Sequence, residues 1–272
     1  MFRWLLLGIA VFPFCTSAQE VKLLPLENLG KQIFFDKNLS EPQGQSCASC
    51  HLPGTGWTGD RSEINAHAAV YPGAVETLSG NRKPPSAAYA TFSPVLHYNV
   101  EEGLFIGGNF WDGRATGWLL GDPAAEQAQA PFLNPVEQNI KNAERVVKIV
   151  CRSTYASELR NFYGQDICNN TVAAYNAIAK AISAYESSTE VNAFSSKYDY
   201  YLKDSKRYPL SKQEMLGLQV FEDEEKGNCA ACHPSQPGDD GAPPLFTDFS
   251  YDNLGVPKNP ENTWYQMPKE IN

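Results

Sequence analysis

The stretch Cys47-Ala48-Ser49-Cys50-His51 lies near the start of the chain, and the same pattern returns as Cys229-Ala230-Ala231-Cys232-His233. Cys-x-x-Cys-His is the attachment signature of a c-type haem. Two intervening residues bring both thiols to one edge of a porphyrin, and the adjacent histidine reaches the iron as its proximal ligand. A redox cysteine pair or half of a zinc site is the alternative. Because both copies end in one of only four histidines, we favour two covalently bound haems.

The first 18 residues have the features of a secretory signal peptide. A short start, Met-Phe-Arg, is followed by an apolar run from Trp4 to Phe14 and by the small residues Thr16-Ser17-Ala18. The run is too short for a membrane span, and no other stretch approaches that length. We therefore expect a protein of the oxidising periplasm, where c-type haem is attached and disulfides persist.

The chain contains 7 cysteines. Cys15 lies in the signal peptide, and four more belong to the two haem motifs. Cys151 and Cys168 remain, and we expect a disulfide between them. Two separate buried thiols are the alternative.

The net charge of the chain restricts the classes of partner that it can bind. The net charge of -9 argues against nucleic acid or an anionic lipid surface. An acidic surface would suit a basic electron donor, although solubility alone also explains it. After removal of the signal peptide the chain is near the size at which one core divides, so two domains are expected.

The apolar periodicity predicts a mainly α fold. Helices are expected over residues 26–35, 136–150 and 171–186, and a capping box at Ser211-Lys212-Gln213-Glu214 opens another through Phe221. Residues 52–110 are rich in Gly, Pro and Ser and are expected to form a long irregular loop. No segment is predicted as a strand. We expect two cytochrome c-like haem domains, over residues 19–205 and 206–272.

Three segments carry a resemblance to a known family. They are Leu29-Gly30-Lys31-Gln32-Ile33-Phe34-Phe35-Asp36, the first haem motif with Ser46, and Phe110-Trp111-Asp112-Gly113-Arg114. Shorter matches occur at residues 134–137, 227–229 and 245–248. The sequence resembles the bacterial di-haem cytochrome c peroxidases, which include MauG-like enzymes that oxidise residues of partner proteins. The resemblance extends over essentially the whole mature chain.

The resemblance implies different roles for the two haems. His51 would ligate the iron of a peroxidatic haem, and His233 would ligate the iron of an electron-transfer haem. Trp111 matches the tryptophan that relays electrons between them. A core aromatic residue at a domain interface is the alternative for Trp111.

Glu137 matches the distal carboxylate of the peroxidatic haem, with Gln127 and Pro131 in the same wall. The chemistry is reasonable, because splitting peroxide needs a base for the proton of one oxygen and an acid for the other. A carboxylate whose pKa is raised by burial can do both. The alternative is a structural carboxylate at the start of the helix expected from residue 136, where the helix dipole would favour it.

Two further histidines need a role. His67 lies at a separation from His51 like that of the removable distal histidine of these peroxidases, which MauG-like members lack. An exposed or hydrogen-bonded histidine is the alternative. His97 is expected to be a packed or surface residue.

The sequence departs from the family in three places. Extra residues at Trp118-Leu119-Leu120-Gly121-Asp122-Pro123 mark a subgroup. Lys83 stands where the family's interdomain calcium site has an asparagine, which argues against calcium unless Asn81 substitutes. The chain stops at Asn272, so the second domain is expected to be incomplete before the distal ligand of its haem. Met267 is only a formal candidate for that ligand.

The expected function is a periplasmic di-haem peroxidase that reduces hydrogen peroxide with electrons from a small cytochrome c or copper protein. One alternative is a MauG-like enzyme that uses peroxide to oxidise Trp or Tyr of a partner protein. A non-enzymatic electron-transfer cytochrome is a second alternative, but it would not need Glu137, Gln127 and Pro131 beside its haem. The sequence is compatible with a homodimer.

Overall fold

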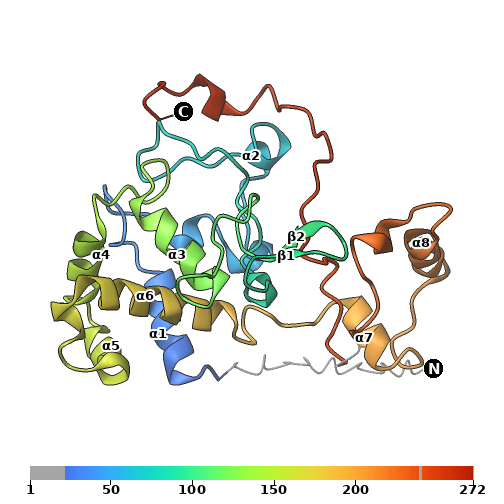
Figure 1. The fold of residues 1–272 in the computed structure, drawn as a ribbon, viewed down its shortest axis with the longest axis horizontal. Helices are drawn as coiled ribbons and strands as arrows, with labels where there is room; N and C mark the ends of the chain where they lie inside the picture. Colours follow the sequence, from blue (N-terminus) through green and yellow to red (C-terminus); the bar gives the residue numbers. More distant parts are fainter. Residues whose placement is uncertain (1–21, 239–240, 272) are drawn as a thin grey trace, which may run out of the picture.

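The computed structural model describes residues 22–238 and 241–271. The expected signal peptide, with Cys15, lies outside this range. The described chain is mainly helical, as predicted, and contains a two-stranded sheet. Helices α1 and α3 to α6 gather on one side of the molecule and α7 and α8 lie on the other, with the β hairpin between them (Figure 1). None of the helices in residues 22–238 and 241–271 has the length and apolar character that a membrane crossing requires.

The helices are α1 (Pro25–Phe34), α2 (Ser62–Ala66), α3 (Pro123–Leu133), α4 (Ala143–Val150), α5 (Ala156–Tyr163), α6 (Thr171–Glu186), α7 (Lys197–Lys203) and α8 (Lys212–Glu222). Strands β1 (His97–Asn99) and β2 (Leu104–Ile106) are antiparallel, with Tyr98 opposite Phe105. The hairpin was not predicted, because three-residue strands are too short to leave a readable alternation.

The packing of α1 against α6 forms the main core. Helix α6 covers the predicted residues 171–186, and the side chain of Asn170 caps it by accepting the Ala173 N–H at 3.1 Å. The two helices cross at Gly30, where a Cβ atom would lie 1.8 Å from the carbonyl oxygen of Ala181. Only glycine therefore allows this close approach.

An aromatic cluster joins this core to the chain that follows the first haem motif. The ring of Phe34 lies 5.5 Å from that of Tyr185 and 6.0 Å from that of Trp57, and Trp57 and Tyr185 are 5.9 Å apart. All three side chains are buried. The first Cys-x-x-Cys-His motif is therefore attached directly to the core.

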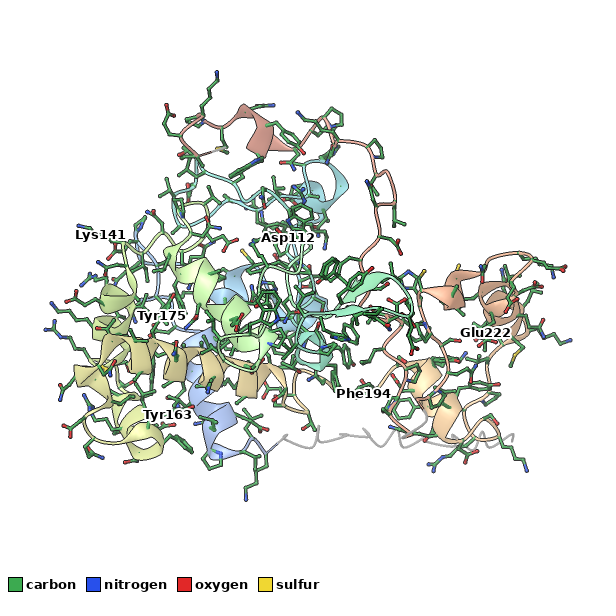
Figure 2. All side chains as sticks on the ribbon, viewed as in Figure 1. Asp112, Lys141, Tyr163, Tyr175, Phe194 and Glu222 are labelled. Carbon is green, nitrogen blue, oxygen red and sulfur yellow. A yellow bond between two sulfur atoms is a disulfide. The ribbon has the colours of Figure 1, made fainter. Side chains whose placement is uncertain are left out.

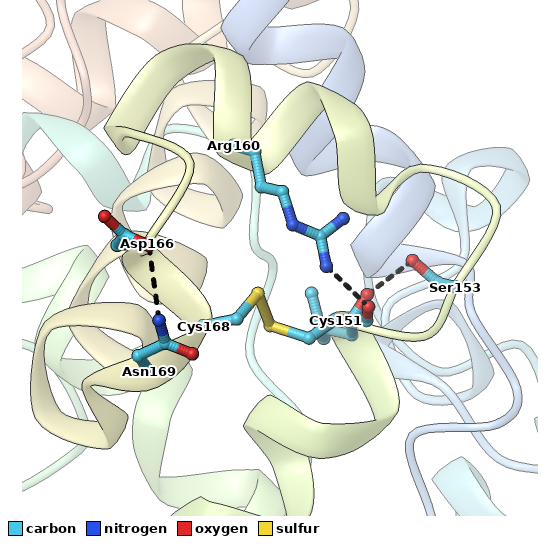
Figure 3. The surroundings of a disulfide bond; sticks show 7 residues. Cys151, Ser153, Arg160, Asp166, Cys168 and Asn169 are labelled. Atoms are coloured by element: carbon cyan, nitrogen blue, oxygen red, sulfur yellow. Dashed lines mark hydrogen bonds between the residues drawn. A yellow bond between two sulfur atoms is a disulfide. The ribbon is translucent and has the colours of Figure 1, made fainter.

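The disulfide expected between Cys151 and Cys168 is confirmed (Figure 3). It joins the end of α4 to a 3₁₀ turn, Ile167–Asn169, that precedes α6. Arg160 of α5 donates a hydrogen bond to the Cys151 carbonyl oxygen at 3.1 Å. The disulfide therefore ties together the two ends of the segment that contains α5, next to α4 and α6.

The described chain after Val191 contains the helices α7 and α8 but almost no buried apolar side chains. Ser211 caps α8 as predicted, accepting the Glu214 N–H at 3.2 Å. Helix α7 precedes the domain boundary expected at residues 205 and 206, yet its contacts are with the residues that follow: Lys197 pairs with Glu214 at 2.6 Å, and the ring of Tyr198 lies 5.6 Å from that of Phe246. Apart from Pro244, residues 192–238 and 241–271 contain no buried apolar side chain.

Candidate functional site

The first Cys-x-x-Cys-His motif forms a 3₁₀ turn. The carbonyl oxygen of Cys47 accepts the N–H groups of Cys50 at 3.1 Å and His51 at 3.0 Å. Ser46 precedes the turn and donates its N–H to the Ser49 hydroxyl at 3.0 Å. Both cysteines are free thiols rather than partners in a disulfide.

The imidazole of His51 is oriented through one nitrogen. Its Nδ1 atom lies 3.0 Å from the Pro85 carbonyl oxygen and 3.2 Å from that of Trp57. With its proton on Nδ1 the ring donates to these carbonyls, and the lone pair of Nε2 is free for a metal. Burial lowers the pKa of His51, which favours the neutral ring that a metal needs.

The second motif repeats this arrangement in a more exposed setting. The His233 N–H donates to the Cys229 carbonyl oxygen at 2.9 Å, and His233 Nδ1 lies 2.8 Å from the Phe246 carbonyl oxygen. Cys232 and His233 are both exposed. Asn228, before the turn, adopts the left-handed backbone region with φ 46°.

Both motifs fit a covalently attached haem. Each offers two free thiols and an imidazole engaged only through Nδ1. Across residues 22–238 and 241–271, no three His, Cys, Asp or Glu side chains gather in a way that could hold a separate metal ion. The calcium site fits poorly, because the Lys83 ammonium donates to the Thr58 hydroxyl at 3.0 Å and already places a positive charge there.

The three residues expected in the distal wall come from one helix and the turn after it. Gln127 and Pro131 are four residues apart on α3 and therefore share a face. Glu137 lies in the following turn, which folds back so that the Gln138 N–H donates to the Pro131 carbonyl oxygen at 3.1 Å. All three side chains are partly buried.

The backbone of a distant segment holds Glu137 in place. The Ala74 N–H donates to the Glu137 carbonyl oxygen at 2.7 Å. A Cβ atom on Gly73 would lie 2.3 Å from the Val136 carbonyl oxygen, so this approach requires glycine. Residues 73 and 74 were not identified from the sequence, because their contribution is a backbone contact that no local pattern reveals.

Burial raises the pKa of Glu137, although the positive charge of Arg114 and a hydrogen bond with Asn134 oppose that rise. The carboxylate lies close to the first haem motif: burial, followed by the negative charge of Glu137, raises the pKa of Cys50 to about 12. The expected helix from residue 136 begins only at Ala143, where Asn142 caps it. The alternative explanation of Glu137 as a helix N-terminal carboxylate is therefore wrong.

Trp111 lies at the tip of a tight loop. Asn109 and Ala115 pair across its base, with the Asn109 N–H donating at 2.9 Å. The indole is 58 % exposed, so the alternative of a core aromatic is wrong for the described chain. The guanidinium of Arg82 lies over it, 4.3 Å from the ring centroid. Figure 2 shows the neighbouring Asp112 in the middle of the molecule.

The Trp111 loop is attached to the part of the chain that orients His233. The hydroxyl of Tyr251 lies 3.4 Å from the Gly108 carbonyl oxygen and 3.5 Å from that of Phe110. The Gly107 N–H donates to the Phe249 carbonyl oxygen at 2.9 Å. Because Phe249 and Tyr251 closely follow Phe246, the loop contacts the second haem region directly.

The two remaining histidines are at the surface. His67 ends α2, and its Nδ1 atom lies 3.2 Å from a carboxylate oxygen of Glu261 in the C-terminal tail. Asn259 also donates to the His67 carbonyl oxygen at 2.9 Å. His97 lies exposed in β1, 2.9 Å from the Val95 carbonyl oxygen, as expected for a surface residue.

The family model of di-haem cytochrome c peroxidases matches residues 25–207. The chain belongs to the di-haem cytochrome c peroxidase family. Among its relatives are the methylamine utilization protein MauG of Paracoccus denitrificans, 34% identical over 236 residues, and the cytochrome c551 peroxidase of Pseudomonas aeruginosa, 30% identical over 207 residues. These alignments cover 86% and 75% of this chain, and 57% and 49% of the relatives.

A solved relative has the same fold. The diheme peroxidase BthA of Burkholderia thailandensis superposes with a TM-score of 0.77 at 34% sequence identity, covering 93% of this chain and 60% of that one. This chain of the di-haem cytochrome c peroxidase family thus spans between about half and three fifths of the length of the relatives named here.

Proposed function

We propose that this periplasmic di-haem peroxidase reduces hydrogen peroxide at the haem held by Cys47, Cys50 and His51. The supporting observation is the position of Glu137, a partly buried carboxyl with a raised pKa, held by a backbone contact beside this motif. Small periplasmic redox proteins, a cytochrome c or a copper protein, are the proposed electron donors.

The bound haem would supply the iron that binds peroxide and stores the oxidising equivalents. The protein supplies the proton chemistry. Glu137 takes the proton from the inner peroxide oxygen and returns it to the outer oxygen, which leaves as water. The Gln127 amide orients the bound molecule by hydrogen bonding, and the ring of Pro131 excludes water without offering a competing donor.

Trp111 is proposed as the relay between the two haem regions. Its loop contacts both sides, with Arg82 preceding the segment that orients His51 and Tyr251 following the residue that orients His233. His233 is therefore proposed as the ligand of an electron-storing haem. We also propose that α7 belongs to this second haem unit, because its contacts lie there.

A MauG-like enzyme, which uses peroxide to oxidise Trp or Tyr of a partner protein, is the second candidate. The contact of His67 with Glu261 favours it, because the imidazole would have to leave this surface contact before it could act as a lock on the first haem. The 34% identity to MauG over 86% of the chain points the same way.

The role of Glu137 is tested by Glu137→Gln in the haem-loaded protein. We expect unchanged haem content and a roughly 10²- to 10⁴-fold slower reaction with peroxide, measured by stopped-flow absorbance. Glu144→Gln, an exposed acid on the neighbouring helix, is the matched control. If Glu137→Gln reacts at the wild-type rate, Glu137 has no part in the reaction.

Spectra of the oxidised and the half-reduced protein, recorded before and after addition of peroxide, separate the two candidates. High-spin iron that appears only after half-reduction supports the peroxidase with a His67 lock. High-spin iron already present in the oxidised protein supports the MauG-like enzyme. Two low-spin haems that do not respond to peroxide would contradict both.

A further inference from the structure

The charge of Arg82 acts on Trp111 without being neutralised by a neighbouring acid. The guanidinium lies 4.3 Å from the indole centroid and donates one hydrogen bond to the Asn81 carbonyl oxygen at 3.0 Å. Asp112 lies next to Trp111 but pairs with Arg114 at 2.7 Å. None of the ion pairs in residues 22–238 and 241–271 involves Arg82.

The loop that carries Arg82 is anchored beside the first haem motif. The Pro84 carbonyl oxygen accepts the Thr58 hydroxyl at 2.6 Å, and the next carbonyl, that of Pro85, orients His51 at 3.0 Å. Two consecutive prolines also restrict the backbone. Arg82 is therefore held three residues from the group that fixes the proximal histidine.

The loop that carries Trp111 is anchored independently. Its base is closed by the hydrogen bonds between Asn109 and Ala115, and the Tyr251 hydroxyl lies against its backbone. The stacked contact thus forms between two loops whose positions are set elsewhere. Replacing the Arg82 side chain should leave both backbones in place.

A cation over the face of a neutral indole is attracted by the ring quadrupole. If the indole loses an electron it becomes a cation, and the same contact becomes a repulsion between like charges. The guanidinium therefore raises the free energy of the oxidised indole relative to the neutral one.

We propose that Arg82 is a positioning residue for Trp111 that orients the indole and keeps its oxidised form sparsely populated. This inference rests on the proposed relay role of Trp111. In each transfer the indole gives one electron towards the His51 region and receives one from the His233 region, with hydrogen peroxide as the final oxidant. No bond to the indole forms or breaks, and the exposed ring returns to its neutral form.

The test compares the haem-loaded wild type with Arg82→Met and Arg82→Lys. After one equivalent of peroxide, the tryptophanyl radical is quantified by freeze-quench electron paramagnetic resonance. Loss of the charge in Arg82→Met should raise the radical yield by about 2- to 5-fold, the range for an exposed cation–π contact. Arg82→Lys keeps the charge and should stay near the wild type.

Arg207→Met is the matched control, because the Arg207 guanidinium lies 5.2 Å from the ring of Tyr208, another partly exposed aromatic. It should not change the tryptophanyl signal. Haem content and circular dichroism establish that each variant is folded, and Arg82→Gln provides a second neutral side chain.

A radical yield in Arg82→Met and Arg82→Gln equal to that of the wild type would overturn the inference. Trp111→Phe separates this result from a failure of the relay. If Trp111→Phe slows electron exchange between the haems while the Arg82 variants change nothing, only the role of Arg82 is wrong. If Trp111→Phe also changes nothing, the relay is wrong and the inference falls with it.

Discussion

The two Cys-x-x-Cys-His turns share one backbone geometry and differ in almost everything around it. Cys50 has φ -115° and ψ -18°, and Cys232 has φ -113° and ψ -17°. Around the first turn, Ala48 is buried and His51 is partly covered. Around the second, Cys232 and His233 are exposed. The motif itself determines the turn, whereas the rest of the chain determines how well each turn is covered.

The difference follows from where the apolar core lies. The chain up to Val191, which contains this core, is called the first region below, and the chain after Val191 is called the second region. The buried apolar cluster begins at Leu29 and ends at Val191, and it includes Trp57 beside the first turn. The described chain beyond Val191 adds only Pro244 to the buried apolar side chains. A porphyrin bound at His233 would therefore contribute a larger share of the apolar contacts of its region.

The largest expected effect comes from disrupting the first region at Gly30. Gly30→Ala would place a methyl group 1.8 Å from the Ala181 carbonyl oxygen, so α1 and α6 would have to move apart. We expect the free energy of unfolding to fall by about 3 kcal/mol or more. Denaturant unfolding of the haem-loaded protein measures this change.

Gly217→Ala is the matched control in the second region. Gly217 lies within α8, and a Cβ atom there would meet nothing within 4 Å. Alanine should leave stability unchanged or raise it by up to about 1 kcal/mol. If both substitutions have the same effect, the two regions do not differ in packing as described.

The second largest effect is expected for the disulfide between Cys151 and Cys168, which lies in the first region. Replacing Cys151 and Cys168 by serine opens a loop with a sequence separation of 17 and should cost about 3 kcal/mol. Hydrogen exchange should speed up in α4 to α6 and not in α8. Equal acceleration in α8 would show that the two regions unfold together.

The third prediction concerns the pH dependence of the first region. Burial, followed by the negative charge of Asp122, raises the pKa of Glu186 at the end of α6 to about 8. The folded protein therefore holds this proton more tightly than the unfolded chain. The contribution of Glu186 to the free energy of unfolding should be fully present below the ordinary pKa of 4.5. It should fall as the pH rises towards 8, by at most about 1.4 kcal/mol per pH unit.

Glu186→Gln should flatten this pH dependence between pH 4.5 and 8, as measured by unfolding at a series of pH values. The variant should be more stable than the wild type at pH 8 and similar to it at pH 4. An unchanged slope would assign the pH dependence to other groups.

The smallest effect is expected in the second region, for Lys197→Ala. Its ion pair with Glu214 joins α7 to α8 at 2.6 Å, and both side chains are largely exposed. Exposed pairs contribute little and are screened by salt. The variant should lower the thermal midpoint slightly at low ionic strength and not at high salt. A large, salt-independent loss would mean that this pair is central to the second region.

The features predicted correctly from the sequence have strong local signals. The Cys151–Cys168 pair, the helix over residues 171–186 and the Ser211 cap each depend on a few nearby residues. Helix α3 was not predicted, because Pro131 inside it suggests a break. The expected helix over residues 136–150 starts late, because Asn139 adopts a positive φ of 59°.

The placement of the site residues depends on distant segments, which local patterns do not reveal. The backbone of Glu137 is held by Ala74, and the Arg82 guanidinium lies over one face of the exposed Trp111 ring. The sequence of residues 82–86 indicates only a variant of the family's calcium loop. In the structure Arg82 lies over the Trp111 indole, and the carbonyl oxygens of Pro84 and Pro85 contact the Thr58 hydroxyl and the His51 ring.

The pairing of α1 with α6 also determines when the first Cys-x-x-Cys-His motif becomes covered as the chain folds. Helix α1 can bury its apolar face only when Thr171–Glu186 packs against it, and that helix lies far along the chain from residues 47–51. If haem is attached in the periplasm, as proposed, the two thiols would stay accessible there until the chain of α6 has arrived and packed. Access to the second motif does not depend on this packing step, because Cys232 and His233 are exposed in the described chain.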